Sequence, residues 1–222
     1  MKLIGNVVLG LLVLCSSASV AVAANVNVVH GIDGRDLSQP QALPVDIAVN
    51  GQCALRGVAF KESALVELAP GDYTITVHIA DGRCAQTAVI TKQVTIPENS
   101  RVFSAVASLS SSGEPQLAIF NVSDLFVPSS VAVRHLAQAG SVTVKFSSSE
   151  ILKSQSTRIR NGKQATLSVL SNRVPYTANI YPGASRRSIA RLTGVGRRKF
   201  TIYNIVGSKT NGFSIIAESL AP

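Results

Sequence analysis

The sequence predicts an all-β protein. Short segments rich in valine, isoleucine and threonine recur along the chain and are separated by glycine, proline and asparagine turns, a rhythm typical of sandwiches. The chain has no tryptophan and only 5% aromatic residues, which suits thin β-sandwiches better than helical cores. No stretch keeps an apolar i, i+3, i+4, i+7 pattern over three turns, so no helix is expected. The expected fold is two tandem immunoglobulin-like β-sandwich domains after a signal peptide.

The N-terminal segment predicts export. Lys2 is followed by an apolar run over residues 3–14, and the segment closes with small residues that end in Ala23 and Ala24. One basic residue, a short apolar core and a small-x-small end are the marks of a secretory signal peptide, so residues 1–24 are expected to be removed. No later stretch is apolar for about 18 residues, the length of a membrane span. A periplasmic, cell-surface or secreted location is therefore expected.

Only two of the three cysteines lie in the expected mature chain. Cys15 falls in the leader, and a lipid anchor there is an alternative, although Leu14 stands where a lipidated cysteine normally follows a small residue. Cys53 and Cys84 form an even pair, which in an exported protein usually becomes a disulfide. Neither a CxxC motif nor a Cys/His cluster with zinc spacing is present, so no metal and no cofactor are expected.

The first unit, residues 25–122, is organised around an alternating strand at 45–49 that runs into an Asn50-Gly51 turn. Two further turns are indicated by the Pro70-Gly71-Asp72 and Asp81-Gly82 sequences. Strands of this unit are expected at 26–30, 45–49, 64–68, 73–79, 87–95, 102–108 and 116–121.

A linker at 123–129 leads into the second unit, residues 130–222. Its segments can be laid over those of the first unit, and each unit opens with a strand that ends in histidine, His30 and His135. The offsets between matching segments change little along the chain, which indicates duplication of one unit. Strands are expected at 131–135, 141–148, 174–181, 199–206 and 213–217.

Three patterns in the first unit occur in a characteristic order. They are the strand end Val28-Val29-His30, the segment 44–51 with its Pro-Val-Asp start and Asn-Gly end, and a later Gly-x-Tyr strand that begins at Gly71. With these patterns, residues 25–120 resemble the bacterial extracytoplasmic family known as domain of unknown function 4397. The resemblance implies exported β-sandwich modules at cell surfaces, often in tandem, and it supplies no catalytic residues. The second unit is degenerate, because Thr143 stands where Asp46 stands.

Charge is distributed unevenly between the two units. Residues 25–120 carry six basic and nine acidic residues, whereas residues 121–222 carry fourteen basic residues against three acidic ones. This excess predicts attraction to a polyanion, with a solvated basic face or self-association through the acidic first unit of a neighbouring copy as alternatives. The candidate polyanion-binding residues are Lys153, Arg158, Arg160, Lys163, Arg173, Arg186, Arg187, Arg191, Arg197, Arg198 and Lys199.

Single polar residues offer weaker candidate sites. His30 and His135 are expected to be structural residues at strand ends, and His78 is expected to be exposed. Asp46 is expected to be solvated or to bond a nearby loop amide. Calcium binding by the loop 31–40, through its aspartates Asp33 and Asp36, is not favoured, because a full ligand array is missing.

These features favour a non-enzymatic periplasmic or cell-surface module whose basic second domain docks on an anionic polymer or envelope surface. Expected partners are an anionic polysaccharide, lipopolysaccharide or a membrane surface. The alternative is a structural, assembly or accessory subunit that binds another envelope protein through a sheet edge, for example in exopolysaccharide modification. No catalytic residues are assigned, because the sequence contains no Gly-x-Ser-x-Gly elbow and no visible nucleophile–base pair. Specific nucleic-acid recognition is not expected, because no motif for it is present.

Overall fold

The computed structural model describes residues 22–99, 101–122, 130–148, 155–168, 175–183, 185, 187–195 and 200–220. These residues form sixteen strands and one short 3-10 helix, η1 (Gly34–Leu37), so the all-β prediction is confirmed. Among them, no helix has both the length and the apolar character needed to span a bilayer. Residues 1–21 of the predicted signal peptide, including Cys15, and the predicted linker 123–129 lie outside the described residues.

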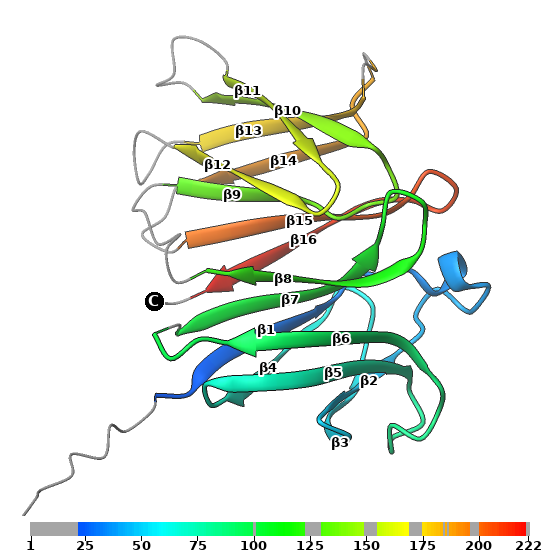
Figure 1. Ribbon diagram of the computed structural model, residues 1–222. Helices are drawn as coiled ribbons and strands as arrows, with labels where there is room; N and C mark the ends of the chain where they lie inside the picture. Colours follow the sequence, from blue (N-terminus) through cyan, green and yellow to red (C-terminus); the bar gives the residue numbers. More distant parts are fainter. Residues whose placement is uncertain are drawn as a thin grey trace, which may run out of the picture.

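The first eight strands form one sandwich, drawn in the lower part of Figure 1. They are β1 (Ala24–His30), β2 (Val45–Val49), β3 (Gln52–Val58), β4 (Ser63–Leu68), β5 (Gly71–Ile79), β6 (Ala88–Ile96), β7 (Val102–Leu109) and β8 (Pro115–Asn121). Sheet A has the order β4-β1-β7-β8, and sheet B has the order β3-β2-β5-β6. Strand β1 runs parallel to β7, and the other neighbours are antiparallel.

The last eight strands form a second sandwich, drawn above the first in Figure 1. They are β9 (Ser130–His135), β10 (Ser141–Ser148), β11 (Gln155–Arg160), β12 (Lys163–Ser168), β13 (Pro175–Pro182), β14 (Ala190–Val195), β15 (Phe200–Ser208) and β16 (Gly212–Leu220). Sheet C has the order β12-β9-β15-β16, and sheet D has the order β11-β10-β13-β14. Each order matches that of a first-sandwich sheet, strand for strand, as expected of a duplicated unit.

Four strands were not predicted from the sequence, namely β3, β11, β12 and β14. All four are edge strands of their sheets. An edge strand packs on fewer neighbours than a central strand, so its apolar alternation is weaker. Strand β11, for example, buries only Ile159.

Each sandwich has its own apolar core between its two sheets. In the first, Val26 and Phe103 of sheet A pack with Ile47 and Val77 of sheet B. In the second, the core includes Val133 and Ile205 of sheet C with Val144, Phe146 and Ile180 of sheet D. Because side chains alternate across a strand, the opposite faces of these sheets point away from the cores.

The outward faces of sheets A and C pack against each other. One apolar cluster joins Val29 and Val106 of sheet A to Val206 and Ile216 of sheet C, and Leu136 packs with them. Strand β7 is buried along its whole length as a result, because one face meets its own core and the other meets the second sandwich. The four sheets are therefore stacked in the order B, A, C, D.

A buried polar network lies at the centre of this contact. Glu218 of β16 accepts hydrogen bonds from Asn27 at 2.8 Å and from Ser104 at 2.8 Å, both on sheet A. It also accepts one from the neighbouring Asn204. Arg134 of β9 is paired with the same carboxylate and lies 4.1 Å from the centroid of the Phe120 ring. Burial lowers the pKa of Arg134 to about 10, which Glu218 offsets only in part, so the guanidinium stays charged at neutral pH.

Loops add further contacts between the sandwiches. The carboxylate of Asp36, in η1, accepts hydrogen bonds of 2.6 Å from Ser208 and from Asn211. Asn161 donates to the carbonyls of Leu109, in the first sandwich, and Ala137, in the second. The two sandwiches are thus tied together by apolar packing, by buried hydrogen bonds and by loop contacts.

Candidate functional site

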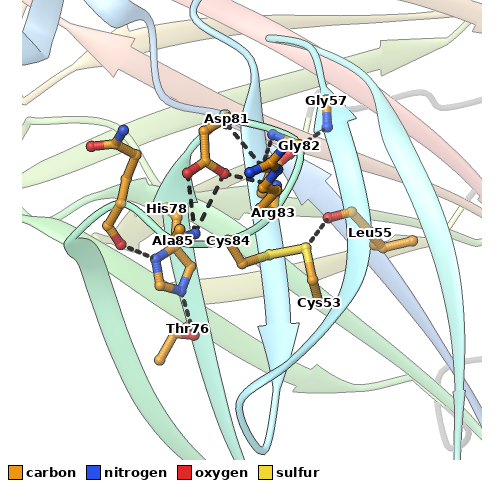
Figure 2. Close-up of a disulfide and its surroundings, with 12 residues drawn as sticks. Cys53, Leu55, Gly57, Thr76, His78, Asp81, Gly82, Arg83, Cys84 and Ala85 are labelled. Atoms are coloured by element: carbon orange, nitrogen blue, oxygen red, sulfur yellow. Dashed lines mark hydrogen bonds between the residues drawn. A yellow bond between two sulfur atoms is a disulfide. The ribbon is translucent and has the colours of Figure 1, made fainter.

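The predicted disulfide between Cys53 and Cys84 is confirmed, with 5.6 Å between the two Cα atoms. Figure 2 shows it joining β3 to the turn 81–85. The carboxylate of Asp81 caps that turn by accepting from the backbone amides of Arg83 at 2.8 Å and Ala85 at 3.2 Å. The bridge therefore pins a tight turn to an edge strand.

Asp46 holds the same turn from inside the protein. Its side chain is fully buried and accepts hydrogen bonds from the backbone amides of Gly57 at 2.8 Å, Asp81 at 3.0 Å and Gly82 at 2.7 Å. Burial opposes ionisation of this carboxyl, but the amide hydrogen bonds outweigh it, so the pKa of Asp46 is lowered. Of the two expected alternatives, a bond to a loop amide is confirmed, and the carboxylate is not solvated.

The Asp46, Cys53 and Cys84 side chains place their ligand-type atoms within 4.8 Å of one another. Both sulfur atoms are already committed to the disulfide, so no thiolate is available to bind a metal ion. The carboxylate oxygens are likewise used by backbone amides. This cluster is a structural clamp on a turn.

The three histidines are all buried. His30 and His135 occupy matching strand ends, and the Nε2 atom of each contacts a backbone carbonyl, Leu43 at 2.9 Å and Ala139 at 3.0 Å. Burial lowers the pKa of both imidazoles, and these carbonyl contacts offset it only in part. His78 was expected to be exposed, but it is only 9% exposed, and both of its ring nitrogens are hydrogen-bonded, one of them to the carbonyl of Gln86.

The aspartates of the loop 31–40 have protein partners. Asp33 pairs with Arg35 at 2.7 Å, and that side-chain hydrogen bond is the main reason why the pKa of Asp33 is lowered. Asp36 binds Ser208 and Asn211 of the second sandwich. Asp33 therefore stabilises the loop itself, and Asp36 stabilises the contact between the two sandwiches.

The outer face of sheet D gathers cations from three strands. Ile159 and Val144 point into the core, so the alternate residues Arg158 and Arg160 of β11 and Lys145 of β10 point outward. The register brings a fourth cation onto the same face, because Lys145 is opposite Asn179, which is opposite Arg191 of β14. We call Lys145, Arg158, Arg160 and Arg191 the basic face.

Two depressions adjoin one edge of the basic face. One has a volume of about 520 Å³ and is lined by Gly140, Ser141, Arg158 and Arg160. The other, about 370 Å³, shares Gly140 and Ser141 and is also lined by Lys209. The Nε atom of Arg158 donates to the hydroxyl of Ser141 at 2.9 Å, which fixes the guanidinium beside the first depression.

The structure divides the predicted polyanion-binding residues into three groups. Arg158, Arg160 and Arg191 lie on the basic face. Arg187 is exposed and precedes β14, the strand that carries Arg191. Lys163 lies instead at the start of β12 in sheet C. The sequence-based set missed Lys145, which becomes a candidate once the strand register is known, and Lys209, which becomes one because it lines the second depression. The predicted cations outside the described residues are Lys153, Arg173, Arg186, Arg197, Arg198 and Lys199.

The charge of this face is a property of the second sandwich alone. The row Lys145–Asn179–Arg191 across sheet D corresponds to the row Ala48–Thr76–Thr91 across sheet B, which is uncharged. Among the described residues of the second sandwich, Glu218 is the only carboxylate, and it is buried between the sandwiches. No described carboxylate therefore neutralises the basic face.

A family profile described as "Domain of unknown function (DUF4397)" matches residues 24–145. The match covers more than half of the 222 residues. The chain belongs to the DUF4397 family. The match includes the whole first sandwich, where the resemblance was recognised from sequence patterns, and it continues through β9 into β10.

Other comparisons give the DUF4397 chain no assigned activity. A search of curated proteins finds no match. Among solved structures, the chain is similar to the Bacillus anthracis TIE protein, with 11% sequence identity and a TM-score of 0.27. The similarity covers 84% of this chain but only 34% of that one, so the chain spans about a third of that structure's length.

Proposed function

We propose that the protein is a non-enzymatic, exported module of the cell envelope whose second sandwich docks on an anionic polymer or anionic envelope surface. The observation that carries this proposal is the basic face, on which four cations share one side of a sheet. No exposed carboxylate competes for them among the described residues of that sandwich. The signal-peptide pattern at the N-terminus supports the assignment to the envelope.

Docking by this face is electrostatic. Each phosphate, sulfate or carboxylate that meets a cation releases condensed counterions from the polymer, so affinity decreases as salt increases. With about four such contacts, we expect affinity to fall about a hundredfold between about 50 and 200 mM salt. Arginine predominates on the face, which favours paired hydrogen bonds to planar or tetrahedral oxyanions.

The test is binding of the intact mature protein to heparin across a salt series. The intact chain is needed because separating the sandwiches would expose Arg134 and Glu218 to solvent. The variant Arg158→Glu/Arg160→Glu is compared with Arg56→Glu/Lys92→Glu, which makes the same change in net charge on exposed positions of sheet B.

We expect the sheet D variant to lose at least tenfold in affinity and the sheet B variant to retain affinity within about twofold. Equal losses in the two variants would show that net charge, not the basic face, drives binding. If the wild type does not bind heparin at low salt, the docking proposal is wrong.

A further inference from the structure

The basic face alternates cations with neutral hydrogen-bonding groups. Across sheet D, Arg158 is opposite Thr143, which is opposite Tyr181. In the next row, Asn179 separates Lys145 from Arg191. Neighbouring strands are about 4.8 Å apart, so the backbone positions of Lys145 and Arg191 are separated by about 10 Å, with the amide of Asn179 between them, and the hydroxyl of Thr143 lies beside Arg158. A ligand that fits this pattern carries anionic groups separated by hydroxyls.

Two other classes of anionic ligand fit the face less well. A membrane surface is normally engaged with inserted apolar side chains, but the exposed large hydrophobic residues in the described chain are Val22 and Leu65, neither of which lies on sheet D. Single-stranded nucleic acid is normally held by stacking on aromatic rings. On this face, the ring of Tyr181 is covered by the ammonium of Lys145, 5.1 Å from its centroid.

The first depression has the size and polar groups for one sugar unit. Its volume of about 520 Å³ falls within the usual range of small-molecule sites. Arg158 uses Nε to bind Ser141, and no described residue accepts from its two terminal nitrogen atoms. Those donors, together with Arg160 and the hydroxyl of Ser141, can hold a carboxylate and an adjacent hydroxyl.

We propose that the ligand of the basic face is an acidic polysaccharide, and that the carboxylate of one uronate unit binds Arg158 and Arg160 in the depression beside Gly140. This inference rests on the proposed docking function and names its ligand class. The chain would continue over Lys145 and Arg191, with its hydroxyls meeting Thr143 and Asn179.

The first arm of the test compares polygalacturonate with its fully methyl-esterified form, measured by calorimetry with the intact mature protein. Esterification removes the carboxylate charge and keeps the sugar backbone. We expect the esterified polymer to bind at least tenfold more weakly. If heparin, which also carries sulfate groups, binds and polygalacturonate does not, recognition through a uronate carboxylate is wrong while the docking function stands.

The second arm blocks the depression without changing charge. Apart from its own chain neighbours, no atom of the described residues lies within 4 Å of the position that a Cβ at Gly140 would occupy, so Gly140→Gln can fold and place its side chain in open space. The control is Thr166→Gln, at an exposed position of β12 in sheet C. We expect a loss of at least fivefold in polygalacturonate affinity for Gly140→Gln and none for the control.

Unchanged affinity in Gly140→Gln, with affinity lost in Arg158→Glu/Arg160→Glu, would rule out the depression as the uronate site while leaving the docking function intact. Inorganic polyphosphate serves as the third probe. If polyphosphate binds as tightly as polygalacturonate and competes with it fully, the face does not select a polysaccharide, and the inference is overturned. Absence of binding to every probe at low salt would instead remove the docking function itself.

Discussion

The guanidinium of Arg134 lies 3.1 Å from the carboxylate of Glu218, and both side chains are shielded from solvent. Both residues belong to sheet C, yet the hydroxyl of Ser104 on sheet A bridges them. It accepts from Arg134 at 2.7 Å and donates to Glu218 at 2.8 Å. Because a buried ion pair needs its remaining hydrogen bonds satisfied, this pair depends on the stacking of the two sandwiches.

Glu218→Ala is expected to lower the free energy of unfolding by about 3–5 kcal/mol, because it leaves the charge of Arg134 buried without a partner. Replacing both residues, as Arg134→Met/Glu218→Leu, should cost less than the single change. Urea unfolding of the intact protein measures both losses. A loss below about 1 kcal/mol for Glu218→Ala would contradict the prediction.

Gly31→Ala tests how closely sheets A and C pack at Gly31. A Cβ at Gly31 would lie 2.8 Å from Cγ1 of Val206 and 2.9 Å from the carbonyl oxygen of Ala107. We expect this overpacking to cost about 1–3 kcal/mol. Adding Val206→Ala should recover only part of the loss, since the clash with the Ala107 carbonyl persists. Thermal unfolding of the single and double variants checks this, and full recovery would argue against it.

The disulfide and Asp46 are expected to be energetically coupled, because they fix the same turn, 81–85. Removing the bridge with Cys53→Ala/Cys84→Ala opens a loop of 31 positions and should cost about 3–4 kcal/mol. Asp46→Ala removes the acceptor of three backbone amides and should cost about 1–3 kcal/mol in the oxidised protein. A double-mutant cycle should give a combined loss smaller than the sum. Additive losses of unfolding free energy would show that the disulfide and the Asp46 hydrogen bonds stabilise the protein independently.

Acidification should destabilise the protein in two stages. Burial holds the pKa values of His30 and His135 below the ordinary value of 6.5, so below that pH the unfolded chain binds more protons than the native protein. The free energy of unfolding therefore decreases as the pH falls through this range, by at most about 1.4 kcal/mol per pH unit for each histidine. Asp46, whose pKa is also lowered, adds a second decrease as the pH falls below its ordinary value of 3.8.

Urea unfolding at several pH values between about 7.5 and 2.5 measures both decreases. In His30→Gln/His135→Gln the first decrease should be largely absent, whereas the second should remain. The same slope in wild type and variant would show that other groups take up the protons.

Lys145 and Lys163 provide a matched pair for the basic face. Both are exposed lysines of the second sandwich, but Lys145 lies on sheet D and Lys163 on sheet C. Lys145→Glu is expected to weaken heparin binding at least fivefold and to make its salt dependence shallower. Lys163→Glu makes the same change in charge and should have an effect of less than about twofold. Equal effects would place the binding surface elsewhere.

Strand periodicity and turn residues were sufficient to predict the all-β fold, the central strands and the pairing of Cys53 with Cys84. These features depend on local alternation or on a simple count of cysteines. The positions that were misjudged depend on non-local contacts. Asp46 and His78 look like outward strand residues, but the segment 81–86 folds over the outer face of sheet B and contacts both of them.

The partnership of Arg134 with Glu218 joins residues 84 positions apart and is completed from the first sandwich. No local pattern in the chain indicates it. One signal for the stacking was present: β7 carries no charged residue on either face and only small polar residues, as expected for a strand covered on both sides. Likewise, Lys145 joins the basic face only through strand register, which the sequence does not specify.

The contact between sheets A and C gives the molecule a fixed length. Sheets pack about 10 Å apart, so the outer faces of sheets B and D are separated by about 30 Å. Asp36 and Glu218 tie the two halves at separate points, which resists hinging between them. Under the proposed docking function, a polymer on sheet D would therefore be kept at a set distance and orientation from whatever meets sheet B, as by a rigid spacer with two chemically different ends.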